Sequence, residues 1–169
     1  SNGILFNHES PRRGETFVTK KIIKALVRIK MGYQKQLVLG NLDSKRDWGH
    51  AKDYVEAMWK ILQQKESDDY VIATGKQYSI RQFVNFVAKK LNMKIVWRGK
   101  GLNETGYDVL NKKNIILVDK NYIRPLDVNT LLGNAAKARR ELKWEPQINI
   151  HTLIDEMIAE EMNILGNDQ

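Results

Sequence analysis

Hydrophobic positions recur along the chain in two patterns, one spaced as on helices and one in short continuous runs. The helical spacing predicts helices over residues 15–31, 51–64, 79–91, 135–142 and 152–165. The short apolar runs predict strands over residues 4–6, 37–39, 70–74, 95–97 and 115–118. Short strands that alternate with helices favour an α/β architecture.

Polar residues, prolines and glycines indicate where these elements begin and end. Pro11 and Gly14 predict a loop after the first strand, and Gly32 predicts the end of the first helix. Ser79 and Gln82 have the spacing of a capping box at a helix start. Residues 98–114 hold several glycines and polar residues, so they predict one long loop.

The predicted strands are too short and scattered for a complete doubly wound sheet. The sequence shows no internal repeat, low-complexity tract or interdomain linker, and 169 residues fit one domain. We therefore expect part of an α/β sheet. No apolar run approaches the roughly 20 residues that a membrane span needs, so we expect no membrane partner.

The composition adds a charge that needs an explanation. Hydrophobic residues make up 42% of the chain, and the absence of cysteine excludes disulfides and fits a cytoplasmic protein. The net charge is +8, and lysines and arginines crowd residues 20–30. This charge is compatible with a solvated helix face, a nucleic-acid surface, a pocket for an anionic small molecule, or an acidic partner region outside the chain. Charge alone does not choose among these.

Several signatures of catalysis are missing from the sequence. Glu104 stands where a glycine phosphate-binding fingerprint that starts at Gly99 and Gly101 would need its last glycine. No tyrosine is followed four residues later by lysine. The histidines lie far apart without metal-ligand spacing, so we expect no metal site. We therefore expect no catalytic residues here and no redox activity from this chain alone.

Two long segments carry the most specific signal: residues 2–19 (NGILFNHESPRRGETFVT) and residues 39–55 (LGNLDSKRDWGHAKDYV). Both closely resemble GDP-mannose 4,6-dehydratases. Further matches follow in the family's order at residues 70–75, 124–125 and 131–133. The resemblance implies the α/β fold of the C-terminal substrate-binding portion of an extended short-chain dehydrogenase/reductase. A few strands and helices would belong to an otherwise missing Rossmann domain.

The family resemblance also implies a domain organisation and a function. Residues 1–169 would form the GDP-mannose-binding half, and the N-terminal NADP-binding Rossmann half would be absent. The complete enzyme, a lyase, would convert GDP-mannose to GDP-4-keto-6-deoxymannose with NADP, as a cytoplasmic homo-oligomer. A related dehydratase of GDP-manno-heptose, or a basic nucleic-acid-binding domain, are the alternatives. We expect GDP-mannose and the missing half as partners, and no nucleic acid.

The resemblance assigns substrate contacts to particular residues. Arg46 and Arg124 match positions that grip the diphosphate, which suits the planar guanidinium fork. Their alternatives are a salt bridge from Arg46 to a neighbouring aspartate and a surface position for Arg124. The other candidates are Asn7 at the substrate phosphates, Lys21 near the nucleotide, the backbone of Leu39, Gly40 and Asn41 at the guanine, and Asp127 at the ribose. Asn7 is alternatively a loop-start cap and Lys21 a solvated lysine, and Asp127 departs from the family's more common glutamate.

A second group matches family positions near the cofactor. His8 and Arg13 resemble residues that touch NADP, and Arg12 belongs to the same loop. The alternative for the arginines is a mobile basic loop before a helix. Trp48 and Trp59, with Tyr54 and Met58, are expected to pack in a core and not to stack on a ligand. In the complete enzyme, the helix that carries them would rest on the Rossmann half.

Overall fold

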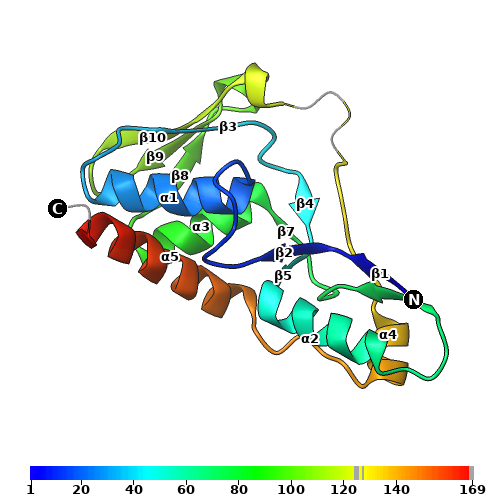
Figure 1. Ribbon diagram of the computed structural model, residues 1–169. Helices are drawn as coiled ribbons and strands as arrows, with labels where there is room; N and C mark the ends of the chain where they lie inside the picture. The colour runs from blue at the N-terminus through cyan, green and yellow to red at the C-terminus, as the bar shows by residue number, and fades with distance from the viewer. Residues whose placement is uncertain (124–125, 127, 168–169) are drawn as a thin grey trace.

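Two hydrophobic cores organise the chain in a computed structural model that describes residues 1–123, 126 and 128–167. The cores define a larger and a smaller lobe, which lie one after the other along an elongated molecule (Figure 1). Short strand pairs join the lobes, so both are built from segments that are far apart in the sequence.

The larger lobe packs three helices against one four-stranded sheet. The helices are α1 (Val18–Lys30), α3 (Ile80–Lys90) and α5 (Ile150–Asn167). The sheet has the order β3 (Leu37–Leu39), β10 (Lys113–Val118), β9 (Thr105–Asp108), β8 (Ile95–Arg98). The β3–β10 pair is parallel and the other two pairs are antiparallel. Fully buried Leu26, Phe83 and Met157, one from each helix, fill the core between them.

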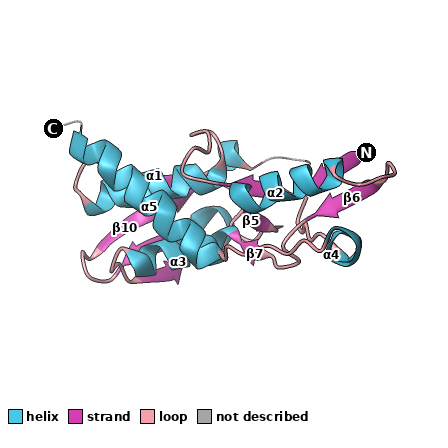
Figure 2. Ribbon diagram, turned by 60° about the horizontal axis from the view of Figure 1, so that its bottom comes forward, coloured by secondary structure: helices cyan, strands magenta, loops and turns pink. Residues whose placement is uncertain are grey.

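The smaller lobe places a parallel two-stranded sheet between two helices. The strands are β1 (Asn2–Leu5) and β6 (Asp69–Ile72), and the helices are α2 (Ala51–Leu62) and α4 (Ala136–Leu142). Figure 2 shows β6 between α2 and α4. Tyr54, Ile72 and Trp144 are fully buried there.

Two short strand pairs and two 3₁₀ turns complete the described part of the chain. The parallel pair is β2 (Asn7–Glu9) with β5 (Trp48–His50), and the antiparallel pair is β4 (Lys45–Arg46) with β7 (Tyr78–Ser79). The 3₁₀ turns are η1 (Gly101–Asn103) and η2 (Lys120–Tyr122). Among the residues that the structure describes, no helix combines the length and apolar character needed to cross a bilayer.

The predicted helices and strands are present, and the Ser79–Gln82 capping box forms as expected. The long loop over residues 98–114 is wrong, because β9 lies inside it. Gly106 faces Ile116 across the sheet, where an added Cβ would lie 2.8 Å from the isoleucine side chain. This glycine therefore allows close strand packing. The polar residues after the first predicted strand likewise form β2, because β5 supplies their backbone partners.

The prediction of a packed core around the aromatic residues is confirmed for Trp48 and Tyr54. Trp48 and Tyr54 are buried, at 2% and 0% exposure. Trp59 and Met58 are exposed, at 61% and 40%, so the described residues alone do not bury them, and their packing against a further half stays a prediction.

A buried carboxylate, Asp47, ties the two lobes together. Its two oxygens accept hydrogen bonds from the Thr74 amide at 2.9 Å, the Thr74 hydroxyl at 2.6 Å, the Gly75 amide at 2.9 Å and the Gly133 amide at 3.3 Å. Asp47 is fully buried, so these donors take the place of water. The strands β4 and β5 are thereby fixed to the end of β6 and to the segment before α4.

We expect Asp47→Ala to lower the free energy of unfolding by about 3 kcal/mol, because it leaves several buried donors without an acceptor. Asp43→Ala is the matched control, since the Asp43 side chain is 79% exposed. It should change the stability by less than about 0.5 kcal/mol. Urea unfolding of both variants measures the difference, and equal midpoints would contradict the role of Asp47.

Candidate functional site

One large pocket opens where β1, β2, β3 and β4 end near the first turn of α1. Its volume is about 870 Å³. Its lining residues are Leu5, Phe6, Asn7, His8, Arg13, Thr16, Phe17, Val18, Lys21, Leu39, Gly40, Asn41, Ser44, Arg46, Ile80, Asn121 and Tyr122. Among the residues that the structure describes, arginine, lysine and histidine occur in this lining and no aspartate or glutamate does. The pocket therefore favours an anion.

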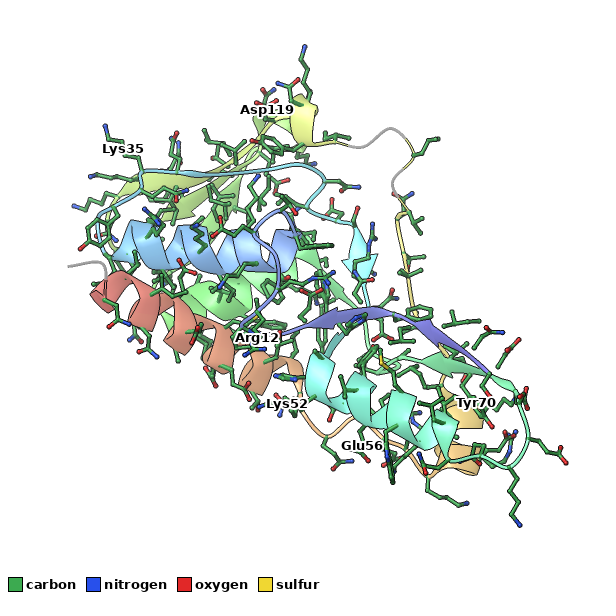
Figure 3. All side chains as sticks on the ribbon, in the orientation of Figure 1. Arg12, Lys35, Lys52, Glu56, Tyr70 and Asp119 are labelled. Carbon is green, nitrogen blue, oxygen red and sulfur yellow. The ribbon has the colours of Figure 1, made fainter. Side chains whose placement is uncertain are left out.

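The structure brings most of the sequence candidates to this pocket. The residues that line it are Asn7, His8, Arg13, Lys21, Leu39, Gly40, Asn41 and Arg46. Arg12 does not line it; Figure 3 shows Arg12 in the loop between β2 and α1, where the residue is exposed. Arg124 and Asp127 lie outside the described residues.

The sequence did not predict that residues of η2 line the pocket. Asn121 and Tyr122 line the pocket, and Asp119 at the start of η2 accepts a hydrogen bond from the Asn121 amide (Figure 3). The segment reaches the pocket because β10 lies beside β3, which puts the carboxyl ends of these two parallel strands together. A local pattern cannot reveal this, although the position of Tyr122 two residues before Arg124 was an available signal.

Gly40 leaves space for another segment of the chain. A Cβ added to Gly40 would lie 2.1 Å from the carbonyl oxygen of Tyr122. The glycine therefore makes room for the η2 backbone, and the close approach is between two parts of the protein. Its neighbours Leu39 and Asn41 still line the pocket.

The cations of the pocket are held by specific contacts. The Lys21 ammonium lies 3.6 Å from the centre of the Tyr122 ring, and burial lowers the pKa of Lys21. Arg46 donates hydrogen bonds to the carbonyl oxygens of Val128 at 2.5 Å and Lys45 at 2.9 Å. On either side of Arg46, Asp43 accepts a hydrogen bond from Arg81, and Asp47 accepts hydrogen bonds from Thr74 and Gly133.

Arg13 forms an ion pair with a buried carboxylate, that of Glu9. Its Nε lies 3.1 Å from a Glu9 oxygen, as an ion pair without hydrogen-bond geometry, and its guanidinium lies 3.5 Å from the Phe17 ring centre. The Thr19 hydroxyl donates to the same Glu9 oxygen at 2.5 Å. Glu9 is 2% exposed, and this burial raises the pKa of its carboxyl despite Thr19 and Arg13, which lower it.

The basic helix is only partly a solvated face. Lys20 is buried in an ion pair with Glu161 of α5 at 3.2 Å, and its ammonium also donates to the Pro11 carbonyl. Lys24 pairs with Glu15 at 2.6 Å, and Lys21 lines the pocket. Contacts within the protein therefore account for much of the charge on this helix.

In the described part of the chain, no group of three histidine, aspartate or glutamate side chains is placed so that it could hold a metal ion. The pocket instead offers hydrogen-bond donors and positive charge. Such a site can bind and orient an anionic organic molecule.

Comparison with known proteins places these features in a family. The sequence model of the GDP-mannose 4,6 dehydratase family matches residues 1–157. The chain is 52% identical over 169 residues to GDP-mannose 4,6 dehydratase 2 of Caenorhabditis elegans, covering 99% of this chain and 44% of that protein. It is 46% identical over 173 residues to GDP-mannose 4,6-dehydratase of Vibrio cholerae, covering 96% of this chain and 46% of that protein. The chain thus spans about half the length of the curated relatives it matches.

Solved structures confirm the fold class. RMD from Pseudomonas aeruginosa complexed with NADPH has a TM-score of 0.77 at 20% identity, covering 96% of this chain and 48% of that one. The dTDP-glucose 4,6-dehydratase from Bacillus anthracis, in complex with NAD, has a TM-score of 0.70 at 17% identity, covering 95% and 44%. The structure is therefore a partial α/β fold of the extended short-chain dehydrogenase/reductase type, as the sequence predicted.

We expect Glu9→Gln to flatten the pH dependence of stability. Because burial raises the pKa of Glu9 above its ordinary 4.5, the stabilisation from this carboxyl is complete below that value and is lost as the pH rises through the folded-state pKa. The parent should therefore lose more stability than Glu9→Gln between about pH 4.5 and 7. Urea unfolding across this range measures it, with exposed Glu15→Gln as control. Parallel profiles for the parent and Glu9→Gln would contradict the prediction.

Proposed function

We propose a function from the premise that the chain belongs to the GDP-mannose 4,6-dehydratase family: it is the substrate-binding part of such an enzyme. The complete lyase would convert GDP-mannose to GDP-4-keto-6-deoxymannose. The observation that carries this proposal is the pocket that Arg13, Lys21 and Arg46 line, with no acidic lining residue among those that the structure describes.

The pocket has the charge that a nucleotide diphosphate requires. A diphosphate carries about two negative charges, which arginine forks and a lysine ammonium neutralise by charge-assisted hydrogen bonds. The first turn of α1 adds to this, because its N-cap Phe17 provides no side-chain cap for the amides there. Amides at a helix start favour anions. We assign the diphosphate to Arg46, Lys21 and Asn7, and to Arg124 from the resemblance.

The remaining lining residues suit the other parts of the ligand. Leu39, Gly40 and Asn41 form the wall at the carboxyl end of β3, where we place the guanine, and we place the ribose near Asp127. The chain would hold the sugar in a fixed orientation, which lowers the barrier of the reaction that follows. We propose that the residues that carry out the chemistry lie outside this chain, which would be inactive alone.

A nicotinamide cofactor fits the same pocket. His8 and Arg13 line it, and Arg13 is backed by Glu9 and Phe17, so its guanidinium has a fixed position. We propose that His8 and Arg13 contact NADP, and that Arg12 contributes from the exposed loop. Bound NADP would supply the hydride acceptor and donor for the internal redox step. A cytoplasmic location and a homo-oligomer remain predictions from the resemblance.

The smaller lobe carries an apolar stripe that is unusual for a free surface. Val55, Met58, Trp59 and Leu62 follow one another at helical spacing on α2, at 61%, 40%, 61% and 77% exposure. The strand residue Ile4 is also exposed, at 55%. A two-stranded sheet is marginal alone, and parallel strands are usually covered on both faces. We propose that the preceding half of a longer protein extends this sheet and covers the stripe.

In the complete protein, we expect Arg46→Ala and Arg124→Ala each to weaken GDP-mannose binding by about 2 kcal/mol, through the loss of a charge-assisted hydrogen bond. GDP should lose as much affinity, because the lost contact is to phosphate. Arg46→Lys should lose less, because the charge remains. The matched control is Lys45→Ala, which removes a neighbouring charge that does not line the pocket. Calorimetry measures all four variants, and unchanged GDP affinity for both alanine variants would remove these arginines from the site.

We expect the 169-residue chain alone to self-associate and to bind a hydrophobic dye, because water meets the apolar stripe of α2. A Trp59→Lys, Leu62→Lys variant should associate less, since both positions are exposed and the substitutions do not disturb the core. Light scattering with size-exclusion chromatography compares the two. A parent that is a compact monomer without dye binding would show that the stripe needs no cover.

A further inference from the structure

His8 lines the pocket, and one of its two ring nitrogens already has a hydrogen-bond partner within the protein. Its Nδ1 is 2.9 Å from the carbonyl oxygen of Phe6. A carbonyl oxygen accepts hydrogen bonds and never donates them, so this contact requires the hydrogen on Nδ1. In a neutral imidazole the other nitrogen, Nε2, is then an acceptor.

The orientation of the His8 ring is set by Tyr54, which reaches it from α2. The two rings stack with their centroids 5.1 Å apart and their planes 29° apart. Tyr54 is fully buried, and the edge of Trp144 packs against it at 6.1 Å and 84°. The stack therefore rests on a rigid ring in the core of the smaller lobe.

Gly49 provides the space for this arrangement. His8 of β2 pairs with Gly49 of β5 in the parallel register. A Cβ at Gly49 would lie 2.4 Å from Cε2 of the Tyr54 ring, and 2.9 Å from the Thr74 methyl group. Only glycine leaves room for an aromatic ring beside the strand position that faces His8.

The hydroxyl group of Tyr54 has no part in this arrangement. Its oxygen is buried and has no hydrogen-bond partner within the described residues. Burial raises the pKa of Tyr54, and the charges of Asp47, Asp53 and Glu9 raise it further, so the hydroxyl stays neutral. A buried hydroxyl without a partner does not stabilise the fold. The ring therefore carries the role.

We propose that Tyr54 is a positioning residue that holds the His8 ring with its hydrogen on Nδ1, so that Nε2 is the nitrogen left to accept a hydrogen bond from the ligand. A neutral acceptor selects a donor group, such as a ribose hydroxyl or a carboxamide, and disfavours a phosphate oxygen. Different residues of the pocket would thus bind different parts of the ligand. Arg13, Lys21 and Arg46 would bind the phosphates, and His8 would accept a hydrogen bond from a neutral donor group. Naming that donor as part of a nicotinamide nucleotide rests on the proposed function; the position of the hydrogen on Nδ1 does not.

Nitrogen-15 NMR of the histidine rings in the complete protein, without ligand at pH 8, tests the first part. His50 is an internal reference for the opposite form, because its Nδ1 accepts from the Lys52 amide and its Nε2 lies 3.0 Å from a Glu156 oxygen. Loss of signals in His8→Gln and His50→Gln assigns the two rings. We expect His8 with hydrogen on Nδ1 and His50 with hydrogen on Nε2. Hydrogen on Nε2 of His8, or on both nitrogens, would overturn the proposal.

Variants of Tyr54 test the positioning. Tyr54→Phe keeps the stack and should leave the His8 signals and the NADP affinity within about twofold of the parent. Tyr54→Leu should shift the His8 signals toward the Nε2–H form and weaken NADP binding about fivefold, the loss that corresponds to one aromatic pair. Tyr54→Met serves the same purpose if the leucine variant does not fold.

A core variant separates positioning from stability. Ile61→Ala truncates another buried residue of α2 in the same core, so it should destabilise the protein and leave the His8 signals unchanged. Unchanged His8 signals in Tyr54→Leu, or shifted signals in Ile61→Ala, would overturn the role of Tyr54. If the signals behave as expected and the parent binds no NADP, the positioning stands and the proposed function fails.

Discussion

The buried carboxylate of Asp47 is the interaction on which the pocket and the junction of the lobes both depend. It lies between Arg46, which lines the pocket, and Trp48, which packs in the larger core. By accepting hydrogen bonds from the end of β6 and from Gly133, it fixes the short connection from β4 to β5. Arg46 is then presented to the pocket from a rigid backbone, although β4 has only two residues.

A second aspartate of the same motif has a similar structural role. Asp53 accepts hydrogen bonds from the amides of Gln147 at 3.1 Å and Ile148 at 3.0 Å, and its backbone carbonyl accepts one from Trp144 at 2.8 Å. These bonds hold the segment between α4 and α5 against the start of α2. Asp47 and Asp53 of the segment 39–55 thus fix the backbone around the pocket, although neither lines it.

Buried ion pairs also fix the chain near the pocket. Glu9 supports Arg13, and Lys20 and Glu161 pair between α1 and α5. A buried ion pair contributes little net stability, but breaking it leaves a charge without a partner, so such pairs tend to define one arrangement. Here they define the loop between β2 and α1, which carries Arg13 to the pocket. The larger lobe completes its own core around these contacts, whereas the smaller lobe leaves the stripe on α2 exposed.

The sequence by itself determined the helices, most strands, the capping box at Ser79 and the family, because each is written in a local pattern or an ordered motif. Through that family resemblance it also named eight of the residues that line the pocket. Only the tertiary structure decided that β9 forms within a glycine-rich segment, that η2 closes the pocket over Gly40, and that Tyr54 lies against His8. Each of these depends on two segments far apart in the chain that meet at a specific distance. Periodicity reports which side of one element is apolar, but not which residue of another element will fill the space beside it.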